Sequence, residues 1–155
     1  MEWGLYRRGL WARGLVEISD NPAVVEDGNF WAVLITYEGA CTFARFREVT
    51  RVPENEFIDH FHQQIWEPIV AEWKSSLSKG DYIDGVKAVR QAIARGDVYQ
   101  INLCRILSVP AQGRRLANLY PRISAGNPAP YLTSMELPEI SIMSASPELL
   151  LRRDG

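Results

Sequence analysis

An amphipathic helix that leads directly into a strand is the clearest pattern in this chain. Residues 78–95 carry apolar side chains at helical spacing, and together these form one stripe: Tyr82, Val86, Val89 and Ile93. Ser78 or Asp81 can cap the start of this helix, and Gly96 follows its last turn, where a left-handed residue is favoured. The sequence therefore predicts a helix with defined ends over residues 78–95.

The strand that follows is predicted from Val98 to about Val109, where Pro110 ends it. Side chains alternate between the two faces of a strand, so Gln100, Asn102 and Cys104 share one face. Burying an amide without a partner is unfavourable, so this face should meet a polar network or a ligand. The alternative is that the two amides bond to neighbouring backbone at the edge of a sheet.

Composition narrows the class of protein. A chain of 155 residues is long enough for one domain that buries about two-thirds of its unfolded surface. The net charge of −2 and the absence of a basic stripe argue against nucleic acid as a partner. Arg7, Arg8 and Arg13 interrupt any apolar signal core, so we expect a cytoplasmic protein. Cys41 and Cys104 lack metal-ligand spacing and are expected to be reduced thiols.

The residues before the central helix predict a hairpin and a second helix. Residues 30–37 form a nearly continuous apolar run, which is typical of a strand covered on both faces. Glu38-Gly39 then provides a turn into a second strand over residues 41–49. Pro53-Glu54 begins a helix with an apolar stripe of Phe57, Ile58, Phe61 and Ile65, and Pro68 should end or kink it.

The C-terminal third predicts another helix and two strands. The helix covers residues 113–123, and the strands cover residues 131–137 and 140–145. Between them, residues 126–131 form a stiff turn because each of its two prolines fixes its own φ. Asp154-Gly155 follows an apolar run and is a strong hairpin signal without a second strand. We therefore expect this sequence to be an N-terminal piece of a longer protein.

Three motifs then occur in a fixed order. Residues 96–103 read Gly-Asp-x-Tyr-Gln-x-Asn-Leu, residues 127–131 read Asn-Pro-Ala-Pro-Tyr, and residues 144–151 read Ser-x-Ser-Pro-Glu-x-x-Leu. Through these motifs, residues 78–155 resemble the chorismate-utilising enzymes, and within that family the component I branch of aminodeoxychorismate synthase. Residues 29–38 resemble the N-terminal half of the family more loosely.

The resemblance implies an α+β fold of antiparallel sheets flanked by helices. Residues 1–77 would supply N-terminal strands and a helix of the same fold, and residues 78–155 would begin the chorismate-binding domain. Members of the family bind chorismate with Mg²⁺, add a nucleophile to its ring and displace the hydroxyl. Aminodeoxychorismate synthase uses ammonia from a glutamine amidotransferase subunit and makes 4-amino-4-deoxychorismate for folate synthesis. The Mg²⁺ ligands are expected beyond Gly155, so this chain alone is expected to be inactive.

Gln100 is the catalytic candidate that the resemblance implies. Water-using relatives carry a lysine on the matching strand, where it acts as a base, and ammonia-using relatives carry glutamine. Water needs a general base to become a competent nucleophile, whereas neutral ammonia is already nucleophilic. An amide that orients ammonia would therefore be sufficient, and we expect Gln100 to face the substrate pocket.

Two further sets of candidates follow from the other motifs. The substrate-pocket candidates are Asn102, Ser144, Ser146 and Glu148. The Ser-Pro-Glu string can equally begin a helix or a turn, because proline is favoured at the first helical position and serine before it. In tryptophan-regulated relatives the matching turn lines an effector pocket, which makes effector-loop candidates of Asn127, Pro128, Ala129, Pro130 and Tyr131. No metal ligand is predicted within the chain.

Two alternative functions stay open. One is anthranilate synthase component I, an ammonia-using relative of tryptophan biosynthesis. The other is a non-catalytic protein that binds a small effector or the amidotransferase subunit. The Ala129 form of the turn and the Tyr-Gln-x-Asn-Leu string favour aminodeoxychorismate synthase.

Overall fold

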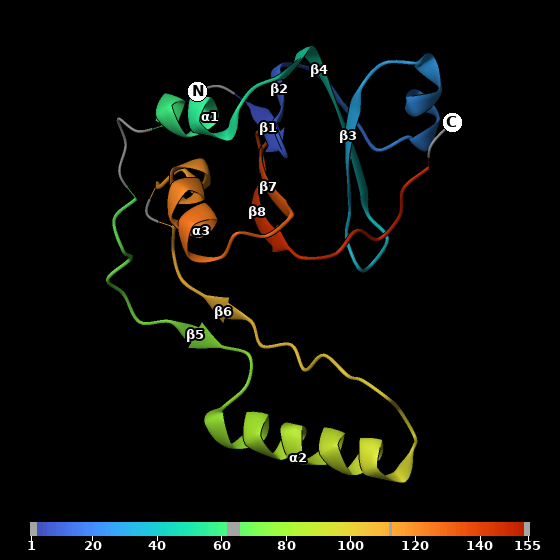
Figure 1. Ribbon diagram of the computed structural model, residues 1–155, viewed down its shortest axis with the longest axis vertical. Helices are drawn as coiled ribbons and strands as arrows, with labels where there is room; N and C mark the ends of the chain where they lie inside the picture. The colour runs from blue at the N-terminus through green and yellow to red at the C-terminus, as the bar shows by residue number, and fades with distance from the viewer. Residues whose placement is uncertain (1–2, 62–65, 112, 154–155) are drawn as a thin grey trace. The chain divides into compact units, whose positions relative to one another are not determined.

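The computed structural model describes residues 3–61, 66–111 and 113–153 (Figure 1). The chain divides into two compact units. We call Met1–Trp66 together with Arg114–Gly155 the sheet unit, and Glu67–Gly113 the helix unit. The boundary between residues 77 and 78, at which the chorismate-binding domain is expected to begin, stays a prediction.

The sheet unit is built on a six-stranded sheet in which each neighbouring pair of strands is antiparallel. The strand order is β3-β4-β2-β1-β7-β8. The strands are β1 (Gly4–Arg7), β2 (Leu10–Ser19), β3 (Trp31–Ile35), β4 (Cys41–Arg51), β7 (Tyr131–Glu136) and β8 (Ser141–Ser146). Residues of both edge strands, β3 and β8, line one cavity of about 870 Å³, so the sheet curls. The predicted α+β fold is confirmed.

Two of the three hairpins in this sheet were predicted. The β3–β4 hairpin closes through Thr36, whose backbone N–H donates to the Ala40 carbonyl at 2.9 Å. The β7–β8 hairpin closes through the Leu137 N–H, which donates to the Ile140 carbonyl at 2.8 Å. The prediction that residues 30–37 are covered on both faces is wrong: Val33 is 48% exposed and Ile35 is 63% exposed. Val33 and Ile35 share one face of β3, whereas Ala32 on the other face joins the buried cluster, so β3 is covered on one face.

The third hairpin, β1–β2, has a turn formed by Arg8 and Gly9. Both residues have positive φ, 50° and 77°, as a two-residue hairpin turn of type I′ requires. Glycine accepts this conformation freely, but arginine rarely does. The sequence signal for such a turn is usually Asn-Gly or Asp-Gly, so this hairpin was not predicted.

The helices α1 (Glu54–Phe61) and α3 (Tyr120–Gly126) of the sheet unit pack on one face of the sheet, together with the short 3₁₀ helix η2 (Leu116–Leu119). A further 3₁₀ helix, η1 (Pro22–Asp27), contacts β4 and lies away from α1 and α3 (Figure 1). Phe57 of α1 and Tyr120 of α3 join a buried cluster with Tyr6, Trp11 and Leu132 from the strands. The second buried cluster lies on the other face and consists of Ala12, Ala32, Ala44, Phe46, Met135 and Leu137. The helix predicted over residues 113–123 begins later than expected, at Leu116, and consists of the 3₁₀ helix η2 followed by α3.

The helix unit contains α2 (Lys79–Arg95) and a two-stranded pair, β5 (Lys74–Ser75) with β6 (Leu107–Ser108). The predicted helix and its caps are confirmed. The Ser78 hydroxyl accepts from the Asp81 N–H at 3.1 Å, and the Asp81 side chain accepts from the Ser78 N–H, which completes a capping box. Gly96 ends the helix with φ 79°.

The strand predicted over residues 98–109 is largely absent. Only Leu107–Ser108 pair as a strand, and the residues between Val98 and Ile106 are irregular. A strand needs a neighbouring strand to satisfy its backbone N–H and C=O groups. Within the described part of the helix unit, only the two residues of β5 provide one.

Candidate functional site

Three of the predicted substrate-pocket residues line one cavity of about 580 Å³. Ser144 and Ser146 lie on β8, and Glu148 follows the end of that strand. Their neighbours in register are Thr133 and Tyr131 of β7, which line the same cavity. The cavity lies on the face of the sheet opposite α1 and α3, because odd-numbered residues of β7 and even-numbered residues of β8 point there.

The Ser146-Pro147-Glu148 string forms a bend, and no helix begins there. The Ser146 hydroxyl donates to the Glu148 carbonyl at 2.8 Å. This bond holds the bend, as the structural interpretation of the string predicts. The exposed Glu148 carboxylate is left at the cavity wall.

Positive charge gathers beside the same cavity. The guanidinium carbons of Arg7 and Arg8 lie 5.3 Å and 5.0 Å from the centroid of the Tyr131 ring. Cations attract the face of an aromatic ring at such distances. Neither arginine forms an ion pair with an acidic residue in the described part of the chain. Of the two arginines, Arg7 lines this cavity, so an anionic group entering it would meet one positive side chain together with the Glu148 carboxylate on the cavity wall.

The predicted effector loop is divided between two cavities. Pro128, Ala129 and Pro130 line a cavity of about 410 Å³ on the helix-covered face, whereas Tyr131 lines the cavity of the serines. Asn127 lines neither described cavity, and its backbone N–H donates to the Ile123 carbonyl at 2.7 Å at the end of α3. The five residues therefore do not line one cavity, and their role as an effector loop stays a prediction.

The cavity behind the prolines holds a polar cluster that the sequence did not reveal. The Glu54 carboxylate accepts from the Tyr120 hydroxyl at 2.9 Å and from the Ser124 hydroxyl at 2.6 Å. Burial raises the pKa of Tyr120 above its ordinary value, and the hydrogen bond to Glu54 and the charge of Glu54 raise it further. Arg8 lines the same cavity, so it presents one positive and one negative side chain.

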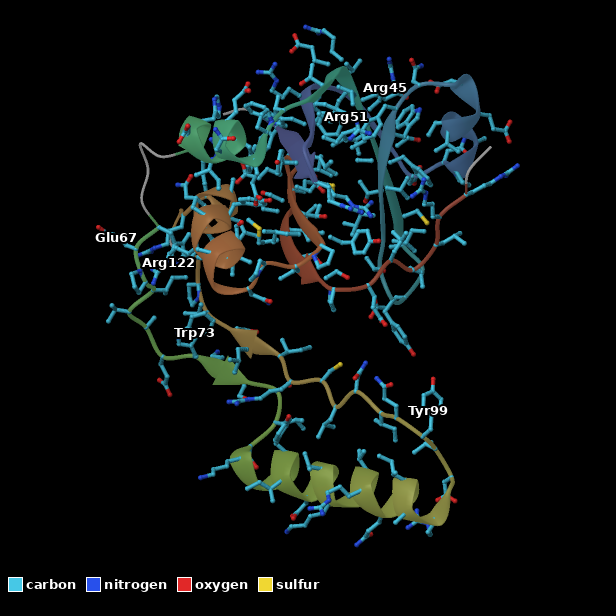
Figure 2. The ribbon with its side chains drawn as sticks, in the orientation of Figure 1. Arg45, Arg51, Glu67, Trp73, Tyr99 and Arg122 are labelled. Carbon is cyan, nitrogen blue, oxygen red and sulfur yellow. The ribbon has the colours of Figure 1, made fainter. Side chains whose placement is uncertain are left out.

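Gln100 and Asn102 belong to the helix unit and are exposed. The expectation that their strand is buried is wrong, because no strand forms there to pack against a neighbour. The Cys104 thiol, predicted on the same face, lies 4.0 Å from the Asn102 carbonyl. Tyr99 is 92% exposed, and Figure 2 shows its ring projecting away from α2. The catalytic role of Gln100 stays a prediction.

Metal ligands do not gather in the part of the chain that the structure describes: no group of three or more histidine, cysteine, aspartate or glutamate side chains lies close enough to hold an ion. Glu148 and Glu54 line separate cavities, and Glu54 already accepts two hydrogen bonds. These residues do not fit a Mg²⁺ site. No helix among the described residues is long and apolar enough to cross a membrane.

Comparison with known proteins gives a family. The model of the chorismate binding enzyme family matches residues 20–155. Anthranilate synthase component 1 1 of Haloarcula marismortui is 38% identical over 85 residues, which are 55% of this chain and 17% of that protein. Anthranilate synthase component 1 of Thermus thermophilus is 36% identical over 85 residues, 55% of this chain and 18% of that protein.

A relative of another branch also matches. Aminodeoxychorismate synthase component 1 of Bacillus subtilis is 34% identical over 79 residues, 51% of this chain and 17% of that protein. The matched region thus covers under a fifth of each of these curated relatives. No solved structure matched the chain.

Proposed function

The chain belongs to the chorismate binding enzyme family, and from this we propose that it is part of component I of an aminodeoxychorismate synthase. In the proposed reaction, ammonia adds to the ring of chorismate, the ring hydroxyl leaves as water, and 4-amino-4-deoxychorismate forms. A glutamine amidotransferase subunit would supply the ammonia. The product would serve the synthesis of p-aminobenzoate and folate.

Gln100 is the observation that carries the ammonia-using chemistry of the proposal, and the Ala129 form of the turn with the Tyr-Gln-x-Asn-Leu string favours aminodeoxychorismate synthase within it. Its carboxamide stands where water-using relatives would carry a basic lysine, and an amide cannot deprotonate water at neutral pH. The carboxamide oxygen can instead accept a hydrogen bond from ammonia and orient the nitrogen lone pair. Ser144, Ser146 and Glu148 are proposed to lie near the substrate, and the positive charge of Arg7 beside them suits the carboxylates of chorismate.

The test is an assay of the polypeptide that contains this sequence, with chorismate, ammonium and Mg²⁺ supplied and the product identified by mass. Gln100→Lys should abolish most ammonia-dependent turnover. Gln91→Lys makes the same change at an exposed position of α2 in the same unit and should leave the rate unchanged. Full ammonia-dependent activity in Gln100→Lys would contradict the role of Gln100.

Anthranilate synthase component I is the second candidate. It is favoured by the relatives from Haloarcula marismortui and Thermus thermophilus, which carry that name and exceed the Bacillus subtilis protein in identity. The same assay separates the two functions, because anthranilate is fluorescent and aromatic whereas aminodeoxychorismate is not. Accumulation of anthranilate would replace the first proposal with the second.

Effector binding is a further role that the cavity behind Pro128, Ala129 and Pro130 supports. Its volume of about 410 Å³ falls in the range of small-molecule sites, and its two charged residues, Arg8 and Glu54, suit the two charges of an amino acid. Calorimetric titration with tryptophan tests this role. Glu54→Gln should weaken binding at least about tenfold, the loss expected when a charged partner is removed. Undiminished affinity for tryptophan in Glu54→Gln would exclude this cavity as the effector site.

A further inference from the structure

A glycine in the interior of α2 lies directly under a side chain of the segment that carries Gln100. A β-carbon at Gly85 would lie 2.9 Å from Leu103 Cδ2 and 3.5 Å from Leu103 Cδ1, so Leu103 rests against the helix backbone. Glycine destabilises a helix interior relative to alanine. The close approach of Leu103 gives a physical reason for glycine at this position.

The segment between α2 and β6 is also fixed at its two ends. At the start, the Gly96 and Asp97 N–H groups donate to the last carbonyls of the helix, both at 3.0 Å. At the far end, the Arg105 guanidinium donates to the Ser75 hydroxyl and the Ile106 N–H donates to the Ser76 hydroxyl, both at 2.9 Å. Figure 1 shows this segment returning from the end of α2 to β6.

The middle of the segment has no strand ladder to hold it. Residues 99–102 are exposed, and no helix or strand includes them. Leu103 follows directly after Asn102 and lies three residues from Gln100, as the Asp97 anchor does on the other side. Its contact with Gly85 is therefore nearer to Asn102 than either end anchor, and it places Gln100 midway between two held residues.

We propose that Gly85 is a positioning residue: it admits Leu103 against α2 and thereby fixes where the segment presents Gln100 and Asn102. The functional part of this inference rests on the proposed role of Gln100. The nearest atoms are all at the end of the flexible Leu103 side chain, so a single β-carbon can be accommodated by a small shift, whereas a leucine at position 85 would displace Leu103 from the helix and release the residues before it.

The first experiment measures ¹⁵N backbone order parameters of residues 99–102 in the 155-residue chain. In the unaltered chain they should approach the rigid value of about 0.85, and Gly85→Leu should lower them below about 0.6. Gly80→Leu is the matched control, because a β-carbon there meets only the Ser78 hydroxyl, at an ordinary 3.6 Å. Leu103→Ala removes the same contact by shortening the side chain that rests on Gly85. It should lower the order parameters of residues 99–102 in the same way, even where Gly85→Leu fails to fold.

The second experiment measures kinetics in the enzyme that contains this sequence. Gly85→Leu should raise the KM for ammonia while the KM for chorismate stays unchanged, and the Gly85→Leu/Leu103→Ala pair should restore part of the loss. Order parameters that are the same in Gly85→Leu, Leu103→Ala and the unaltered chain would overturn the inference. An unaltered enzyme that forms no aminated product would instead refute the proposed function, so the two failures are distinguishable.

Discussion

Replacing Phe57 with alanine should remove much of the stability of the sheet unit. Phe57 is 3% exposed and is the point where α1 meets the sheet. Its ring stacks on Tyr6 with centroids 3.9 Å apart and planes 9° apart. It also meets Trp11 and Tyr120 edge to face, at 5.5 Å and 5.0 Å.

The expected loss follows from these contacts. Phenylalanine-to-alanine changes in a core destabilise by about 3–5 kcal/mol, because apolar area is lost and a cavity remains. Aromatic pairs add about 0.5–1.5 kcal/mol beyond their area. Phe57→Leu keeps most of the apolar volume and loses the ring geometry, so it should cost about 1–2 kcal/mol. A domain of ordinary stability, about 5–15 kcal/mol, would lose a large share of it through Phe57→Ala.

Urea unfolding followed by circular dichroism measures these differences. Val33→Ala on the edge strand β3 is the control and should stay within about 0.5 kcal/mol, because Val33 is about half exposed and lies outside both buried clusters. A loss below about 1 kcal/mol in Phe57→Ala would mean that α1 does not depend on this cluster. The reasoning would then be refuted for the whole helix-covered face.

Three other outcomes are expected. Glu136→Ala should cost about 1.5–3 kcal/mol in urea unfolding, because the buried Glu136 carboxylate accepts hydrogen bonds from the Arg115 guanidinium and from the Ala117 N–H; a smaller loss in Glu136→Met/Arg115→Leu would confirm that losing the charged hydrogen bonds is the cause. The raised pKa of Tyr120 stabilises the fold below the ordinary tyrosine pKa near 10, so stability should fall as pH rises above 10, and Tyr120→Phe should flatten that fall in alkaline unfolding curves. Ser78→Ala should cost α2 about 1 kcal/mol, seen as lost helical circular dichroism on heating.

The elements that sequence reasoning predicted are those whose signals lie within the element. The helix α2 is predicted by an apolar stripe, a serine before it and a glycine after it. The serine caps the start of the helix and the glycine ends it, as predicted. The β7–β8 hairpin follows from two apolar runs around Pro138-Glu139. In both cases the physical cause acts over a few residues, so a local pattern contains it.

The features that were missed depend on residues far apart in the chain. Glu54 and Tyr120 are 66 positions apart, and nothing near either residue indicates that a carboxylate meets a phenol. The strand predicted from Val98 has suitable residues but lacks a neighbour, and pairing is a property of two segments. Gly85 lies in the interior of α2 outside its apolar stripe, and no local pattern indicates that Leu103, 18 positions later, contacts it.

The Asn-Pro-Ala-Pro-Tyr motif shows why a contiguous string need not form one site. Its last residue begins β7, where successive side chains point to opposite faces. Tyr131 consequently faces the cavity of Ser144 and Ser146, while Leu132 and the prolines before it line the cavity of Glu54. The motif is therefore a wall between two cavities. Tyr131→Ala and Pro130→Ala should for this reason differ in effect, the first on the proposed substrate site and the second on tryptophan binding, and equal effects on both activities would contradict the division.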